Sequence, residues 1–471
     1  MYINGELVNS VTGKKQSVIC PGTGETVGEI AWAGKEDAEL ALNAAKNAFK
    51  TWSKLSINSR KIWMDKFRNA VIAHEHDIRE TVMYEMGKTY NQTMEDYETV
   101  VNSLEWYSQE MLHRRDEIIP DPDGGHIHRI VSKAAGVAVG YLAWNFPLLN
   151  FGFKIGPALA SGCTIIIKPS ANAPLSAYLM GEILNSIDFP KGVVNIMAGA
   201  NNELALTLSS SNIPRIITMI GSSVSGRIAM QQAATSIKHF SMELGGNAPA
   251  IVFDDAKLSC AVNDLAALKF GNCGQICVSP NRIFVHEKVF DEFVKRFVEK
   301  AKEIKVGFGE DPDIEMGPIV DEHSRERIME LVEKTLSEGA KLECGGGIPK
   351  GLEKGCFFEP TVFTQVERNM TIFKEEIFGP LAAIYKFKTE KEVLDMANDC
   401  EVGLSSYIYT SDVNRVHKFS KELEVGEVHV NGFKYAIYLP HGGVKESGLG
   451  YDCSHLALDD YLEKKRITIK I

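Results

Sequence analysis

The sequence predicts an α/β protein with two or three domains. Short apolar segments that suit buried strands alternate with amphipathic segments that suit helices, an order typical of parallel sheets covered by helices. No internal repeat interrupts this alternation. The chain has 471 residues, which is too long for one ordinary hydrophobic core, so we expect more than one domain.

The composition is that of a globular protein, with 44% hydrophobic and 24% charged residues. No apolar run reaches the roughly 18 residues of a membrane span, and the first residues lack the basic and apolar regions of a secretory signal. We therefore expect a cytoplasmic protein without a membrane partner. The net charge of −11 disfavours nucleic acid as the main partner. The nine cysteines are scattered and have no zinc-ligand spacing, which predicts reduced thiols and no metal site.

The first succession of strands and helices resembles a nucleotide-binding domain. Buried strands are predicted at residues 137–143, 164–168, 193–197 and 216–220, and helices at 154–161 and 175–187. The Gly-x-Gly-x-x-Gly fingerprint of the common dinucleotide fold is missing. We therefore expect a variant of that fold.

A second α/β succession begins after Glu243 and contains Cys277. It opens with a strand predicted at residues 250–253, and a helix follows. Residues 290–304 form an amphipathic pattern whose apolar positions recur at helical spacing, which predicts a helix packed against a core.

Residues 118–132 and 466–471 are typical of ribbon-like strands and suggest an appended arm. The last six residues alternate apolar and polar side chains strictly. This pattern suits a half-buried edge strand whose pairing partner belongs to another subunit. An ordinary edge strand within the same chain is the alternative.

Cys277 and Glu243 lie in the two most informative motifs of the chain. Cys277 ends the segment Asn-Cys-Gly-Gln-Ile-Cys, and Glu243 begins Glu-Leu-Gly-Gly. A thiol in a loop of small residues can approach a carbonyl carbon, and a nearby carboxylate can activate water. A lone cysteine is usually an inert buried thiol. The combination of both motifs instead predicts covalent catalysis through a thioester.

With these motifs the chain resembles the NAD(P)-dependent aldehyde dehydrogenase superfamily, nearest in type to the lactaldehyde, succinate-semialdehyde and aminoaldehyde dehydrogenases. Further motifs in the family's order extend the resemblance over essentially the whole chain: Trp144-Asn145-Phe146-Pro147, Lys168-Pro169-Ser170, Gly221-Ser222 through Gly226, Glu376-Ile377-Phe378-Gly379-Pro380 and Pro440-His441-Gly442-Gly443.

The resemblance implies the aldehyde dehydrogenase fold, in which a variant Rossmann cofactor domain is joined to an α/β catalytic domain and a β-ribbon oligomerisation arm. The implied boundaries place residues 1–117, 133–242 and 434–459 in the cofactor domain, 243–433 in the catalytic domain, and 118–132 and 460–471 in the arm. A homodimer or homotetramer is the implied assembly.

For the chemistry, the resemblance implies oxidation of an aldehyde to a carboxylic acid. Cys277 would add to the carbonyl, and Asn145 would stabilise the alkoxide together with the Cys277 backbone N–H. Hydride transfer to a nicotinamide would leave a thioester, which water activated by Glu243 would hydrolyse. CoA-acylating relatives lack this glutamate, so hydrolysis is favoured. Lys154 would relay protons near the nicotinamide ribose; a solvated helix lysine is the alternative.

The implied cofactor is NADP or NAD, and we expect the protein to use both. Ala171 occupies the position where NAD-selecting members have a glutamate, so the repulsion of a 2′-phosphate is missing. Lys168 would bond the adenosine ribose, and Glu376 the nicotinamide ribose. The expected cofactor-binding residues are Trp144, Lys168, Ser170, Ala171, Gly221, Ser222, Gly226, Leu244, Glu376 and Phe378.

The implied substrate is a short polar aldehyde that is hydroxylated or anionic, such as lactaldehyde, sulfolactaldehyde or succinate semialdehyde. Phe153 replaces an arginine that relatives acting on such aldehydes often carry, so an aminoaldehyde or simple aliphatic aldehyde is the alternative. A non-catalytic structural protein on the same fold is a remote third possibility. The expected substrate-pocket residues are Asn150, Phe153, Ile276, Val278, Tyr435 and His441.

Overall fold

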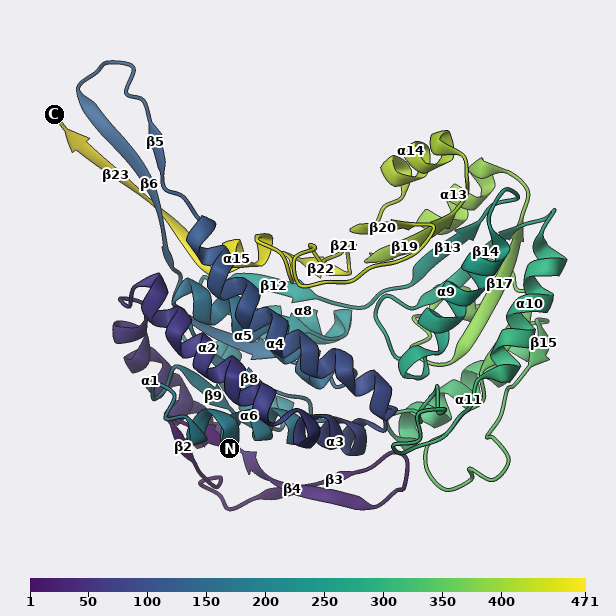
Figure 1. Ribbon diagram of the computed structural model, residues 1–471, viewed down its shortest axis with the longest axis horizontal. Helices are drawn as coiled ribbons and strands as arrows, with labels where there is room; N and C mark the ends of the chain where they lie inside the picture. Colours follow the sequence, from purple (N-terminus) through teal and green to yellow (C-terminus); the bar gives the residue numbers. More distant parts are fainter.

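The computed structural model describes all 471 residues, and an eight-stranded sheet forms the core of the half that contains the N-terminus (Figure 1). Its strand order is β2-β1-β9-β8-β7-β11-β12-β22, in which β9 through β12 are parallel and the outer strands are antiparallel. The strands are β1 (Tyr2–Ile3), β2 (Glu6–Leu7), β7 (Val137–Tyr141), β8 (Thr164–Lys168), β9 (Val194–Ile196), β11 (Pro214–Ile220), β12 (His239–Glu243) and β22 (Gly448–Leu449).

Helices cover both faces of this sheet, because its central strands are apolar on both sides. In β8, Ile165 and Ile167 pack in the same core as Phe151 of α5, whereas Ile166 packs on the other face with Leu42 of α1. The helices of this half are α1 (Lys35–Trp52), α2 (Ile57–Ala73), α3 (Glu75–Met86), α4 (Thr93–Glu110), α5 (Pro147–Ser161), α6 (Leu175–Ser186), α7 (Leu206–Ser210), α8 (Ser223–Ala233) and α15 (Leu456–Asp460).

The four strands predicted in this half all form, but helix α5 begins at Pro147 rather than at residue 154. Proline is favoured in the first turn of a helix because its missing N–H would have no partner there. The Asp96 carboxylate accepts the N–H groups of Leu148 and Leu149, each at 3.0 Å. This long-range cap cannot be read from the local pattern, and it extends the helix toward Asn145.

A seven-stranded sheet with its own 46-residue core forms the second half. All neighbouring strands are parallel except β15. The order is β15 (Lys341–Cys344), β16 (Thr361–Thr364), β17 (Leu381–Phe387), β14 (Pro280–His286), β13 (Ala248–Val252), β19 (Ser405–Tyr409) and β20 (Glu427–Val430). Its helices are α9 (Leu258–Phe270), α10 (Phe290–Glu303), α11 (Glu322–Ser337), α12 (Thr371–Lys374), α13 (Glu390–Asn398) and α14 (Val413–Glu422).

Two small sheets complete the body of the molecule. The first has the order β10-β4-β3, with β3 (Lys15–Ile19), β4 (Thr26–Ala33) and β10 (Ala198–Gly199), and the second pairs β18 (Val402–Gly403) with β21 (Val444–Lys445). None of the helices combines the length and apolar character needed to cross a membrane.

An arm of three antiparallel strands projects from the first half (Figure 1). It consists of β5 (Glu117–Ile119), β6 (His126–Ala134) and β23 (Leu462–Lys470). Strand β23 pairs with β6 of the same chain along its whole length, from Leu462 opposite Ala134 to Lys470 opposite His126. One edge of β23 is thus paired within the chain, as in the alternative expectation, and its other edge is unpaired; pairing of that edge with another subunit stays a prediction. The hairpin at residues 118–132 provides a complementary edge within the chain.

Candidate active site

A cavity of about 1130 Å³ is lined by residues of both halves. It receives the carboxyl ends of the parallel strands β7, β8, β11 and β12, which is where α/β sheets commonly bind ligands. Three of the predicted site residues, Lys154, Gly226 and Leu244, do not line it. The others do: Trp144, Asn145, Asn150, Phe153, Lys168, Ser170, Ala171, Gly221, Ser222, Glu243, Ile276, Cys277, Val278, Glu376, Phe378, Tyr435 and His441.

The loop that carries Cys277 is held by the polar residues of its own motif. Gln275 accepts the backbone N–H of Val320 at 2.9 Å, and the Asn272 amide donates to the backbone carbonyl of Asn145 at 2.9 Å. Asn272 and Cys273 adopt positive φ angles of 46° and 56°, and at Gly274 a Cβ would collide with the carbonyl of Gly379. The tight turn explains why small residues surround the thiol.

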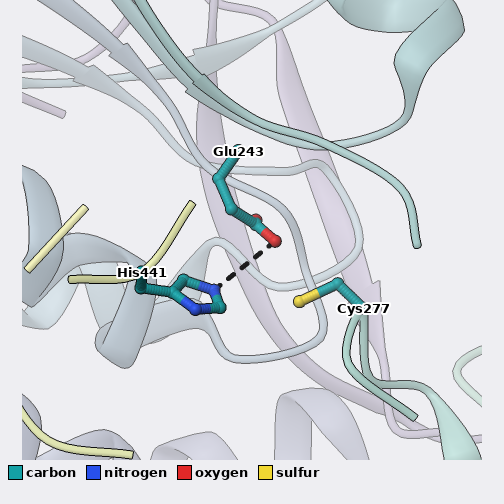
Figure 2. A group of neighbouring side chains, drawn as sticks. All are labelled: Glu243, Cys277 and His441. Atoms are coloured by element: carbon teal, nitrogen blue, oxygen red, sulfur yellow. Dashed lines mark ion pairs between the residues drawn. The ribbon is translucent and has the colours of Figure 1, made fainter. Parts of the chain in front are cut away.

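Cys277, Glu243 and His441 converge at one point of the cavity (Figure 2). The Cys277 Sγ, a Glu243 carboxylate oxygen and a His441 ring nitrogen all lie within 4.8 Å of one another. Glu243 ends strand β12 and is 3% exposed, and its Oε1 has no hydrogen-bond partner. Burial raises the pKa of the Cys277 thiol well above its usual range; the charge of Glu243 adds to this increase and His441 opposes it.

His441 is oriented by Glu427, a residue that no sequence motif indicated. The His441 Nδ1 lies 2.7 Å from Glu427 Oε1, and Nε2 lies 3.6 Å from Glu243 Oε1. Burial disfavours the charged imidazole, but the charge of Glu427 prevails and raises the pKa of His441. For Glu427, the opposing effect of burial is outweighed by the charge of His441 and by hydrogen bonds from His429 and His441, and its pKa falls to about 2.

Asn145 lies beside this group in the turn between β7 and α5. Its side chain is buried, and the Nδ2 donates to the backbone carbonyl of Gln275 at 3.1 Å. The contact joins Asn145 to the loop of Cys277 and leaves the second Nδ2 hydrogen available for another acceptor. Its Oδ1 has no partner.

Lys154 occupies a different environment from either sequence-based expectation. Its side chain is fully buried, so the solvated alternative is wrong, and its Nζ bonds Asp452 Oδ1 at 2.6 Å and Oδ2 at 2.8 Å. Asp452 and His441 also exchange backbone hydrogen bonds of 2.7 and 2.8 Å. The buried pair therefore anchors the segment that carries His441, and a role of Lys154 in proton relay stays a prediction.

The expected adenine side of the cavity contains a cation without an acidic partner. Burial lowers the pKa of Lys168, at the end of β8, to about 8. Ser222 caps α8 by accepting the N–H of Ser225 at 3.2 Å, so the start of this helix faces the cavity. A Cβ on Gly226 would lie 2.7 Å from the Leu244 side chain. Gly226 and Leu244 pack α8 closely against β12 instead of lining the cavity.

The nicotinamide side is built from both halves of the molecule. Glu376 Oε1 accepts the N–H of Gly246 at 2.9 Å, and burial raises the pKa of Glu376 to about 7. The rings of Trp144 and Phe378 meet edge to face with their centroids 5.3 Å apart. Two aromatic rings thus lie beside a carboxylate. This combination suits a ligand whose flat ring packs on the aromatic side chains and whose ribose hydroxyls donate to the carboxylate.

The expected substrate end is partly aromatic. The His441 ring lies 6.0 Å from the rings of both Phe153 and Tyr435, measured between centroids. The Asn150 amide donates to the Ala143 carbonyl at 3.1 Å, so part of its hydrogen-bonding capacity is already used. No arginine lines the cavity; its cationic or titratable basic residues are Lys168, His429, Lys434 and His441.

Comparison with known proteins agrees with this geometry. The Aldehyde dehydrogenase family model matches residues 7–467. The NADP-dependent succinate-semialdehyde dehydrogenase of Escherichia coli is 35% identical over 99% of this chain and 97% of its own length. The glutarate-semialdehyde dehydrogenase of Pseudomonas putida strain KT2440 is 35% identical over 100% of this chain and 97% of its own.

Solved structures show the same similarity in three dimensions. A 3,6-anhydro-L-galactose dehydrogenase in complex with NAP superposes with a TM-score of 0.97 at 34% identity, covering 100% of this chain and 99% of that one. The family, the fold and the use of NAD or NADP predicted from the sequence are thereby confirmed. The protein belongs to the aldehyde dehydrogenase family and is an NAD(P)-dependent enzyme.

Proposed function

We propose that the protein oxidises a short polar aldehyde, hydroxylated or anionic, to the free carboxylic acid through a thioester on Cys277. The observation that carries this proposal is the convergence within 4.8 Å of the Cys277 thiol and the Glu243 carboxylate, whose Oε1 accepts no hydrogen bond, in a cavity shared by both halves.

Each residue of this group has a role that follows from its position. The Cys277 sulfur adds to the carbonyl carbon, and the resulting alkoxide is stabilised by the Asn145 amide and the Cys277 N–H. A bound NAD or NADP supplies the hydride acceptor. Glu243, whose free Oε1 can accept a proton from water, then activates the water that hydrolyses the thioester.

The residues at the two ends of the cavity suggest how the cofactor would be bound. Lys168, which lines the cavity, would donate to the adenosine ribose, and Gly221 and Ser222, which directly precede α8, would face the pyrophosphate. Glu376 would accept hydrogen bonds from the nicotinamide ribose. Phe378 would pack beside the ring.

The basic side chains His441, His429 and Lys434 favour an anionic or hydroxylated substituent near the aldehyde, and Phe153 and Tyr435 limit its size. Semialdehydes of short dicarboxylic acids, which the relatives above oxidise according to their names, meet these requirements. Glu95 and Glu427 also line the cavity and would attract a cation, so an aminoaldehyde is the second candidate.

A substrate panel tests the proposal. The purified protein is assayed for reduced cofactor with succinate semialdehyde, lactaldehyde, an aminoaldehyde and a simple aliphatic aldehyde, each with NAD and with NADP. Product analysis without coenzyme A should show the carboxylic acid, and Cys277→Ala should abolish turnover while retaining cofactor binding. Turnover that persists in Cys277→Ala, or that requires coenzyme A, would contradict the mechanism.

We also infer that the arm joins copies of this chain. Ile118 and Ile471 of the arm are 71% and 72% exposed, and β23 leaves one edge unpaired, which favours association through this surface. Light scattering should show a dimer or tetramer. Deletion of residues 466–471 should dissociate it or make the protein insoluble, whereas a monomeric wild type at micromolar concentration would refute this role of the arm.

A further inference from the structure

The group of Glu243, Cys277 and His441 contains the ligand types of a zinc site. A carboxylate oxygen, a thiol sulfur and an imidazole nitrogen point toward one another (Figure 2), all within 4.8 Å. Bonds of about 2.0–2.3 Å in tetrahedral geometry place zinc ligands roughly 3.3–3.8 Å apart. The 3.6 Å separation of Glu243 Oε1 and His441 Nε2 is already in that range.

Two further observations distinguish this group from a chance cluster. Glu243 Oε1 is buried and accepts no hydrogen bond, and its ion-pair neighbour is the second nitrogen ligand, His441 Nε2. Glu427 binds the Nδ1 of His441 at 2.7 Å, which turns Nε2 toward Glu243 and Cys277. A carboxylate that holds the far nitrogen of a histidine is the usual support of a metal-bound imidazole, because it sets the tautomer and strengthens the ligand.

The supporting structure keeps the three ligands in place. Glu243 ends β12, and His441 is joined by two backbone hydrogen bonds to Asp452, whose carboxylate is held by buried Lys154. All three ligand residues line the cavity, which provides an entry path and an open fourth position. This is the arrangement of zinc sites with three protein ligands.

We propose that Zn²⁺ binds reversibly between Glu243, Cys277 and His441, releasing the protons of the Cys277 thiol and of His441 Nε2 to solvent, and that the bound ion inhibits the enzyme by occupying the nucleophile. The mixed sulfur, nitrogen and oxygen ligands select a thiophilic cation over Mg²⁺ or Ca²⁺, which prefer oxygen alone. Inhibition rests on the proposed function of Cys277, but binding of the ion does not.

Binding is tested on the full chain after treatment with a chelator. Calorimetric titration with Zn²⁺ should give one site per chain, and Cd²⁺ should produce a thiolate charge-transfer band in the ultraviolet. Cys277→Ala should remove that band, and His441→Phe should weaken Zn²⁺ binding at least about 100-fold. Glu427→Gln, which removes the carboxylate that holds His441 Nδ1 together with one negative charge of the cavity, should weaken it by about 10- to 100-fold.

Matched controls separate this site from adventitious histidine binding. His417 is exposed on α14 outside the cavity, and His126 and His128 lie together on the arm. His417→Phe and His126→Ala/His128→Ala should both leave the site unchanged. Circular dichroism verifies that each variant is folded. Unchanged affinity in His441→Phe and Cys277→Ala would overturn the proposal.

The activity assay distinguishes the two proposals. If an aldehyde is oxidised, micromolar Zn²⁺ should inhibit the wild type reversibly on addition of a chelator, and Mg²⁺ should not. Stoichiometric Zn²⁺ binding in a protein that oxidises no aldehyde would refute the proposed function while supporting the metal site. An active enzyme that binds no Zn²⁺ would refute the metal site alone.

Discussion

Replacing Lys154 by methionine should lower the free energy of unfolding by about 3–5 kcal/mol, the usual cost of removing one partner of a buried ion pair. The side chains of Lys154 and Asp452 are 0% and 4% exposed, so water cannot compensate the carboxylate that is left behind. Methionine fills a similar volume, which keeps the cavity contribution small. The electrostatic effect therefore dominates the expected loss.

Urea unfolding followed by circular dichroism measures the effect in Lys154→Met, in Asp452→Asn and in the double variant. The double variant should recover most of the loss, because no buried charge remains unpaired. The matched control is Lys391→Met, which breaks a pair of the same 2.6 Å length whose side chains are 84% and 53% exposed. That change should cost less than about 1 kcal/mol. A loss in Lys154→Met no larger than in this control would refute the argument.

Three further predictions test the site and the core. Glu243→Gln should give one burst of reduced cofactor in rapid mixing and then stall at the thioester, whereas a uniformly slow hydride step without a burst would contradict this order. Ala171→Glu should shift the kcat/KM ratio toward NAD by roughly 1–3 kcal/mol, and an unchanged ratio would place selectivity elsewhere. Burial raises the pKa of Glu85 to about 8 from an ordinary 4.5. Glu85 should therefore contribute a loss of up to about 1.4 kcal/mol of stability per pH unit between these values, and the slope measured by urea unfolding should be smaller by that contribution in Glu85→Gln than in the wild type.

The local patterns were sufficient for the central strands of the first sheet and for the principal candidate residues of the site. Strand β8 was predicted with its observed bounds, because five consecutive residues with a β-branched apolar centre are compatible with a strand buried on both faces. Cys277, Glu243 and Asn145 were indicated by their motifs, and the structure brings all three to one cavity. Candidate catalytic residues that belong to short motifs can therefore be predicted from the sequence alone.

Contacts between distant segments could not be predicted in this way. Glu427 belongs to a four-residue strand with no recognisable motif, and only the packing of β20 beside the returning segment places it against His441. Lys154 is paired with Asp452, which is far away in the chain, and the start of α5 depends on a cap from Asp96 on another helix. The sequence pattern carries no information on such pairs.

The sequence by itself determined the α/β class, the aldehyde dehydrogenase resemblance and the candidate nucleophile, because strand periodicity and the motif around Cys277 are local properties of the chain. The tertiary structure decided that the terminal strand pairs with β6 of its own chain, that Lys154 is a buried ion-pair partner, and that Glu427 orients His441 beside the thiol. These features depend on which surfaces meet when the two sheets and the arm pack. Burial of apolar surface and pairing of charges over the whole molecule determine those contacts.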